Sequence, residues 1–160
     1  VRPQVKWIND LVVNTKKLGG ILTEMSVNKG RVDYAIIGIG INCCHKEEDF
    51  SPEIRDIAAS LAMVTGTEIN RARVAAAMME SLFKMDQILL TEKSAILDRY
   101  RKNCITIGQE VSLLRVGEEV RHGKAVGMDD EGALLVTFPD GHTEAVNSGE
   151  VSVRGMYGYV

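Results

Sequence analysis

The sequence predicts an α+β chain in two parts, with a sheet and helices over residues 1–107 and a small antiparallel barrel over residues 108–160. Long apolar runs and helical periodicity fill the first part, whereas short alternating runs separated by glycine-bearing turns fill the second. The charge changes at the same boundary: the first part carries 15 Lys+Arg against 13 Asp+Glu, and the second carries 4 against 9. An acidic second part repels phosphate, so we expect no nucleic-acid binding there.

The first part begins with three predicted strands. Val5–Val13 and Leu18–Met25 are apolar, β-prone stretches separated by a polar turn, which is a hairpin-like pattern. A second turn at residues 28–31 precedes Val32–Ile41, a nearly continuous apolar run. Such a run is typical of a strand buried on both faces, so we expect Val32–Ile41 to be the central strand.

The middle of the first part is predicted to be helical. Ser51, followed by proline and glutamate, has the features of a helix start, and Gly66 those of a helix end. Asn70 can cap a longer second helix, and a third is predicted around residues 96–100. Apolar residues recur in the second helix every three or four positions: Val74, Met78, Leu82, Met85 and Leu89.

The second part is predicted to be a small barrel. After Gly108, turn residues containing glycine divide the sequence into segments that fit five short strands. Closing such strands into a barrel removes the exposed edges that an open sheet leaves.

Length and composition fit a soluble, folded protein. The chain has 160 residues, 45% of them hydrophobic, and no apolar run approaches the roughly 20 residues of a membrane span. The three cysteines, Cys43, Cys44 and Cys104, are odd in number and cannot form a disulfide framework, so we expect a reducing, cytoplasmic location. The chain begins at Val1 and its first methionine is Met25, and we interpret the sequence as a fragment.

Lys6 lies within a strand pattern, next to Trp7 and Ile8. Burying an ammonium group without a partner costs roughly several kcal/mol, so we expect an anionic group to bind it. One interpretation is a structural ion pair with Asp10 or an extended side chain that reaches solvent at a sheet edge. The other is a lysine that binds an anionic ligand.

Gly38 and Gly40 fall on the same face of a predicted buried strand, and Asn42 follows at its end. Glycines there let a ligand lie against the backbone, or let a helix pack closely. A Rossmann dinucleotide turn does not fit, because the third glycine of that fingerprint is missing and no helix opens directly after it.

Two further groups of side chains are not predicted to form a functional site. Cys43, Cys44 and His45 invite a metal hypothesis, but adjacent cysteines lack the spacing of metal ligands, so no metal site is predicted. His122 and His142 lie in turns of the second part without a nucleophile and carboxylate, and we expect them to be surface residues.

Four segments together resemble the biotin protein ligase family in order and spacing. They are Lys6–Asp10 (KWIND), Lys17–Leu22 (KLGGIL), Gly38–Asn42 (GIGIN) and Ser148–Gly155 (SGEVSVRG). The resemblance implies part of a mixed β-sheet catalytic domain, of the class II aminoacyl-tRNA synthetase and biotin synthetase-like kind, at residues 1–107. It implies an SH3-like barrel at residues 108–160.

The resemblance also implies a two-step ligase reaction. Biotin and Mg-ATP form biotinyl-AMP, and a lysine of a biotin carboxyl carrier domain then takes the biotinyl group. The family's catalytic lysine corresponds to Lys6, which also binds the ligand together with Gly38, Gly40 and Asn42. Arg154 corresponds to an arginine that approaches the nucleotide.

The sequence departs from the family pattern at two places. Ile8 stands where the family often has proline, and no Gly- and Arg-rich loop, which in the family folds over biotinyl-AMP, is present. We therefore expect the fragment alone to be inactive and to need a companion segment. A homodimer through a sheet edge is a second possibility, with the Leu11–Lys17 hairpin as its contact.

Two other functions remain open from the sequence. The first is a non-catalytic interaction module related to the ligases, and the second is a lipoate-attaching ligase. Binding of biotin and ATP would distinguish the module, and a substrate panel would distinguish the acyl group.

Overall fold

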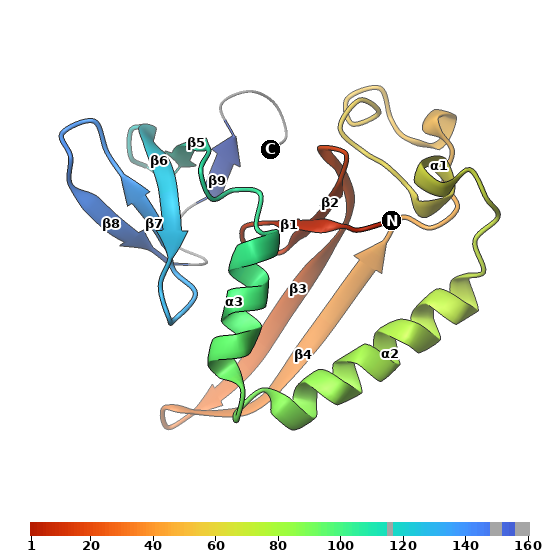
Figure 1. Ribbon diagram of the computed structural model, residues 1–160, viewed down its shortest axis with the longest axis horizontal. Helices are drawn as coiled ribbons and strands as arrows, with labels where there is room; N and C mark the ends of the chain where they lie inside the picture. The colour runs from red at the N-terminus through yellow and green to blue at the C-terminus, as the bar shows by residue number, and fades with distance from the viewer. Residues whose placement is uncertain (115–116, 148–151, 156–160) are drawn as a thin grey trace.

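The computed structural model describes residues 1–114, 117–147 and 152–155, with side chains described up to residue 147. Two β-sheets are joined by a helical segment (Figure 1). The first sheet has four strands in the order β1-β2-β3-β4, and the second has five in the order β8-β7-β6-β5-β9. Within these described ranges, no helix is both long and apolar enough to cross a bilayer.

The first sheet is an antiparallel meander of four consecutive strands. Its strands are β1 (Gln4–Lys6), β2 (Asp10–Val13), β3 (Lys16–Asn28) and β4 (Arg31–Ile41). The single strand predicted over residues 5–13 is wrong: a turn divides it into β1 and β2, which pair with each other antiparallel. Separate short strands result because the turn reverses the chain after only three residues.

The pairing of this sheet differs from the mixed sheet that we expected. Every pair of named strands is antiparallel, and parallel contacts are limited, in the described chain, to isolated bridges of Val5 with Cys104 and of Lys17 with Ala58. β2 is paired on both sides, so the Leu11–Lys17 hairpin offers no free strand edge for a dimer. β4 stands at an edge of the described sheet and is largely exposed, so the prediction of a central, buried strand is wrong.

Three α-helices and one 3-10 turn follow: η1 (Glu47–Asp49), α1 (Leu61–Thr65), α2 (Arg71–Ile88) and α3 (Lys93–Asn103). The Asn70 cap is confirmed, since its side chain accepts a hydrogen bond from the Arg73 amide at 3.0 Å. Gly66 ends α1 in the left-handed conformation, with φ of 66°.

The predicted helix start at Ser51 is wrong, because Ser60 caps α1 instead, accepting from the Met63 amide at 3.1 Å. Residues 52–57 form turns, and the chain then runs beside β3. Lys17 donates its amide to the Ile57 carbonyl at 2.7 Å and accepts from the Ala59 amide at 2.8 Å. These contacts hold residues 57–59 against a distant strand, where local signals favoured a helix.

The second sheet contains the five short strands that were predicted. They are β5 (Glu110–Leu114), β6 (Arg121–Met128), β7 (Leu134–Thr137), β8 (Thr143–Val146) and β9 (Ser152–Gly155). The expected closed barrel is not seen: β8 and β9 are the two edges of an open sheet over the described residues. Closure requires strands that tilt and stagger about a common axis, and edge strands of four residues each give little stagger.

Trp7 links the first sheet to the core of the second. This side chain follows β1, yet it is only 5% exposed and packs in the core of the second sheet. Its amide donates to the Thr106 hydroxyl at 2.9 Å and its indole to the Gly132 carbonyl at 3.1 Å. Tyr100 supports the same turn by donating its hydroxyl to the Ile8 carbonyl at 3.0 Å.

Burial, and to a smaller extent nearby Cys104, raises the pKa of the Tyr100 hydroxyl above its usual value. The group therefore remains a hydrogen-bond donor at any physiological pH. Its role at the junction of the two sheets is structural.

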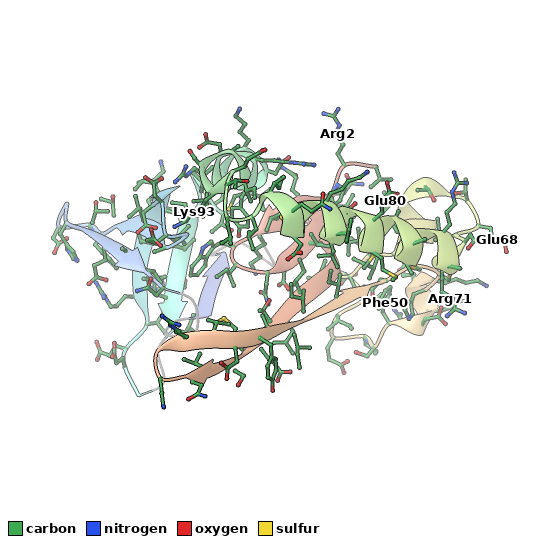
Figure 2. All side chains as sticks on the ribbon, turned by 90° about the horizontal axis from the view of Figure 1, so that it is seen from below. Arg2, Phe50, Glu68, Arg71, Glu80 and Lys93 are labelled. Carbon is green, nitrogen blue, oxygen red and sulfur yellow. The ribbon has the colours of Figure 1, made fainter. Side chains whose placement is uncertain are left out.

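Large apolar side chains remain exposed on the hairpin of β3 and β4. Figure 2 shows the helices on one side of this hairpin and further side chains on the side away from them. Leu22, Met25, Tyr34 and Ile36 are 56–64% exposed. The predicted apolar stripe of α2 is only partly covered: none of its residues is fully buried, and Met85 and Leu89 are exposed. Within the described chain, neither surface has a partner of comparable size.

We expect Trp7→Ala to lower the free energy of unfolding by about 3–5 kcal/mol, because it empties a core site and leaves the Gly132 carbonyl without its indole donor. Trp7→Phe keeps most of the volume and loses only the indole donor, so about 1–2 kcal/mol is expected. Urea unfolding followed by circular dichroism measures both. A Trp7→Ala protein within about 0.5 kcal/mol of the parent, as for a surface site, would show that the junction is not a stabilising contact.

Candidate ligand-binding site

A hollow of about 480 Å³ lies open on one face of the first sheet. It is lined by Asn9 and Asp10 at the start of β2, by Lys17 and residues 20–22 of β3, and by residues 38–40 of β4. The structure thus brings Gly38 and Gly40 together in one concave surface, as expected from their spacing. Asn9 braces the rim by donating its side-chain amide to the Ile21 carbonyl at 2.6 Å.

Gly38 and Gly40 leave space that nothing else in the described chain fills. A Cβ added at Gly40 would meet no atom within 4 Å, and one at Gly38 would meet only the Leu22 carbonyl oxygen, at 3.7 Å. Close packing against a helix therefore does not explain these two glycines. Gly19 is different, because a Cβ there would lie 2.2 Å from the Gly40 carbonyl oxygen. The fold requires glycine at 19, whereas at 38 and 40 glycine serves the open floor.

Lys6 shares a face of the sheet with this floor. Consecutive strand pairings place Lys6 opposite Asp10, Asp10 opposite Gly20, and Gly20 opposite Gly40. Directly opposed residues in antiparallel strands point to the same face, so the Lys6 side chain and the glycine floor lie on one side. Lys6 and Gly40 are three strand spacings apart, about 14 Å. Lys6 therefore lies at one end of the row Lys6–Asp10–Gly20–Gly40 and does not lie against the glycines.

An ion pair that the sequence did not predict lies between them. Lys17 Nζ is 2.6 Å from Asp10 Oδ1, with side-chain exposures of 42% and 20%. Asp10 is therefore bound to Lys17, which lines the hollow, and it also lies directly opposite Lys6 in the strand register. The pair places a second ammonium group close to the floor, on the face that carries Lys6.

The strand register explains why Gly20 was missed. If residues are paired one by one outward from the turns at residues 14–15 and 29–30, Asp10 lies opposite Gly19, and Gly19 lies opposite Gly40. Each hairpin contains a one-residue shift, between Leu11 and Val12 and between Ser26 and Val27, so that Gly20 takes that place. A shift of one residue exchanges the two faces of a strand, and no local sequence signal marks these shifts.

Asn42 lies just beyond β4 and is held by the backbone around it. Its side-chain amide donates to the Ala59 carbonyl at 3.1 Å, and its main-chain amide donates to the Leu18 carbonyl at 2.9 Å. The structure therefore places Asn42 at the end of the strand that carries the floor and gives it a structural contact there. Arg154 belongs to β9, where it pairs with Ser112, and its side chain lies outside the described residues.

The remaining candidates lie apart from the hollow. Over the described ranges, no three His, Cys, Asp or Glu side chains are grouped so that they could hold a metal ion. His122 and His142 are exposed on the second sheet. The His142 ring hydrogen-bonds to Asp140 and holds the pKa of this carboxyl below its usual value, which stabilises a surface turn.

Two family models match the chain. Residues 2–42 match the Biotin/lipoate A/B protein ligase family, and residues 106–154 match the Biotin protein ligase C terminal domain. The first match contains Lys6 and both floor glycines, and the second contains Arg154. The chain belongs to the biotin protein ligase family.

Individual members of the biotin protein ligase family resemble most of the chain. The bifunctional ligase/repressor BirA of Bacillus subtilis is 37% identical over 142 residues, which are 88% of this chain and 43% of the relative. The biotin–[acetyl-CoA-carboxylase] ligase of Mycobacterium tuberculosis is 27% identical, over 92% of this chain and 52% of its own length. The chain thus spans about half the length of these relatives.

A solved family member has the same architecture. The biotin protein ligase of Aquifex aeolicus in complex with biotin and ATP superposes with a TM-score of 0.79 at 28% identity, covering 97% of this chain and 63% of that one. The α+β arrangement of this chain, with its two antiparallel sheets, is therefore the arrangement of a family member over nearly the whole length described.

We expect Gly40→Ala to leave folding intact or to stabilise it by about 0.5 kcal/mol, because the added methyl group meets open space and reduces backbone freedom in the unfolded chain. Gly19→Ala is the matched variant and should destabilise by about 1–3 kcal/mol, because its methyl group collides with the backbone of β4. Urea unfolding of both variants measures the difference. Equal stability of the two would contradict the assignment of Gly19 to folding and Gly40 to the floor.

Proposed function

We propose that the intact protein is a biotin protein ligase. In the first step, a carboxylate oxygen of biotin attacks the α-phosphorus of Mg-ATP, forming biotinyl-AMP and releasing pyrophosphate. In the second, the amine of a carrier-domain lysine attacks the acyl carbon, AMP leaves, and the amine loses its extra proton. The observation that carries the proposal is the row on one sheet face that runs from Lys6 to the side-chain-free floor at Gly40.

Lys6 is the proposed catalytic residue. Its fixed positive charge would stabilise the negative charge that develops on the attacked phosphate. A unit-charge contact at about 4 Å, with an effective dielectric constant near 20, contributes roughly 4 kcal/mol before desolvation. The distance of about 14 Å between Lys6 and Gly40 suits a long ligand with its acidic centre at Lys6 and an uncharged end at the glycines.

The other site residues take binding roles in this proposal. Gly38 and Gly40 would face the biotin and adenylate groups, and Asn42 would mark the nucleotide end of β4. Arg154 would approach the nucleotide from the second sheet. Lys17, held at the rim by Asp10, would place a second ammonium group near the adenylate.

We propose two domains, residues 1–107 and 108–160, that act only with a further segment of the catalytic domain. The hollow is open, and the face that forms it also exposes Leu22, Tyr34 and Ile36 by 56–64%. Apolar surface of this kind stabilises a protein only when another element covers it. The relatives are about twice as long, and the part outside the match is the proposed cover and the remaining wall of the site.

The proposed partner is the biotin carboxyl carrier domain of a biotin-dependent carboxylase, in line with the name of the Mycobacterium relative. A lipoate-attaching ligase is the second candidate, because the family model that matches residues 2–42 includes such enzymes. The match of residues 106–154 to a domain named for biotin protein ligases favours biotin.

Lys6→Ala in the complete gene product should lower kcat/KM for biotinyl-AMP formation by about 100-fold or more, as for loss of a charged group that stabilises a transition state. Lys6→Arg should not restore it, because a planar guanidinium replaces a compact ammonium. Pyrophosphate release measures the step, with biotin and lipoate as separate substrates. Lys29→Asn is the control: it removes one charge from the far turn of the same sheet, where asparagine tolerates the positive φ of 49°.

Unchanged activity in Lys6→Ala would overturn the catalytic role of Lys6. Adenylation of lipoate but not of biotin would assign the second candidate. A complete protein that gives no heat with biotin or ATP in calorimetry would instead be a non-catalytic relative.

The 160-residue chain alone should form no biotinyl-AMP and should bind biotin at least about 100-fold more weakly than the complete gene product, because part of the site wall is supplied by the covering segment. Calorimetry with biotin compares the two proteins directly. Equal affinity would show that the described chain holds the whole biotin site and that the exposed apolar face has another purpose.

A further inference from the structure

Two adjacent cysteines lie together in a second hollow of the first part. Cys43 and Cys44 follow β4 after one residue, and both are free thiols, Cys43 half-buried and Cys44 exposed. Both side chains line a hollow of about 340 Å³, which also includes His45, Asp49 and Arg71. Two thiols that open onto one space can act on one ligand.

The loop that carries them is fixed by its backbone. The carbonyl groups of Asn42, Cys43 and His45 accept hydrogen bonds from residues 60–62, at the start of α1, at 2.8, 2.9 and 2.5 Å. Cys44 donates its thiol to the Ile69 carbonyl at 3.6 Å. The peptide units on both sides of the cysteine pair are thereby tied to a neighbouring segment, and only the side chains are left to rotate.

This anchoring disfavours a direct bond between the two sulfurs. Adjacent Cα atoms lie about 3.8 Å apart across a trans peptide, whereas disulfides usually span roughly 4.4–6.8 Å between Cα atoms. A Cys43–Cys44 disulfide would therefore distort a backbone that three hydrogen bonds hold in place. An atom inserted between the sulfurs adds length to the bridge and relieves this constraint.

We propose that Cys43 and Cys44 form a dithiol site for trivalent arsenic compounds. Soft thiolate sulfur selects soft, polarisable centres of this kind. With an organoarsenic oxide, two As–S bonds form, the As=O bond breaks, and the oxygen leaves as water with the two thiol protons. Arsenic remains trivalent throughout, so the step needs no oxidant or reductant. Cys104 cannot take part, because it is 8% exposed and packs in the core with Trp7.

Phenylarsine oxide tests the site on the native 160-residue chain. Intact-mass spectrometry should show one phenylarsenic group per chain, which excess 2-mercaptoethanol does not remove and 2,3-dimercaptopropanol does. Two of the three cysteines should react with N-ethylmaleimide in the native protein, and none after treatment with phenylarsine oxide. The third should react only after unfolding.

Single variants separate two-thiol binding from one-thiol binding. Cys43→Ser and Cys44→Ser should each lose the adduct that resists 2-mercaptoethanol, whereas Cys104→Ser, the matched control, should keep it. Circular dichroism verifies that each variant is folded. Retention of the resistant adduct in either Cys43→Ser or Cys44→Ser, its loss in folded Cys104→Ser, or no adduct on the parent chain overturns the proposal.

Discussion

Trp7 connects the two parts of this protein, and the position of Lys6 depends on it. The residue follows β1 of the first sheet, but its side chain is buried in the core of the second, where its indole donates to the Gly132 carbonyl. Its main-chain amide donates to Thr106, at the end of the first part. Lys6 precedes it by one residue. Apolar burial and two hydrogen bonds therefore fix the strand end that carries the proposed catalytic charge, and they orient the second sheet, which contains Arg154, relative to it.

Glycine has two different roles in the first sheet. At Gly19 the backbone of β4 approaches so closely that a side chain has no room, which is a requirement of folding. At Gly38 and Gly40 room exists and is left empty, which the proposed binding role requires. The Asp10–Lys17 pair lies beside this empty floor, so the same face combines a surface without side chains with concentrated charge.

The exposed faces of β4 and α2 show what an apolar pattern does and does not encode. The periodicity of α2 predicted its helix, and the apolar run of β4 predicted its strand, yet neither is buried in the described chain. A pattern records which face of an element suits burial, because the hydrophobic effect acts on area and not on a particular partner. The pattern does not say which element covers that face.

The sequence by itself determined the features that nearest neighbours decide: the cap at Asn70, the helix end at Gly66, the five short strands after Gly108, and the set of motifs that assign the family. It predicted Gly38 and Gly40 on one face because strand periodicity is local. Only the tertiary structure decided the split of β1 from β2, the move of the helix start from Ser51 to Ser60, the open second sheet, and the row from Lys6 to Gly40. Each of these depends on contacts between segments far apart in the chain, and a one-residue shift in such pairing exchanges the faces of a strand without changing any local signal.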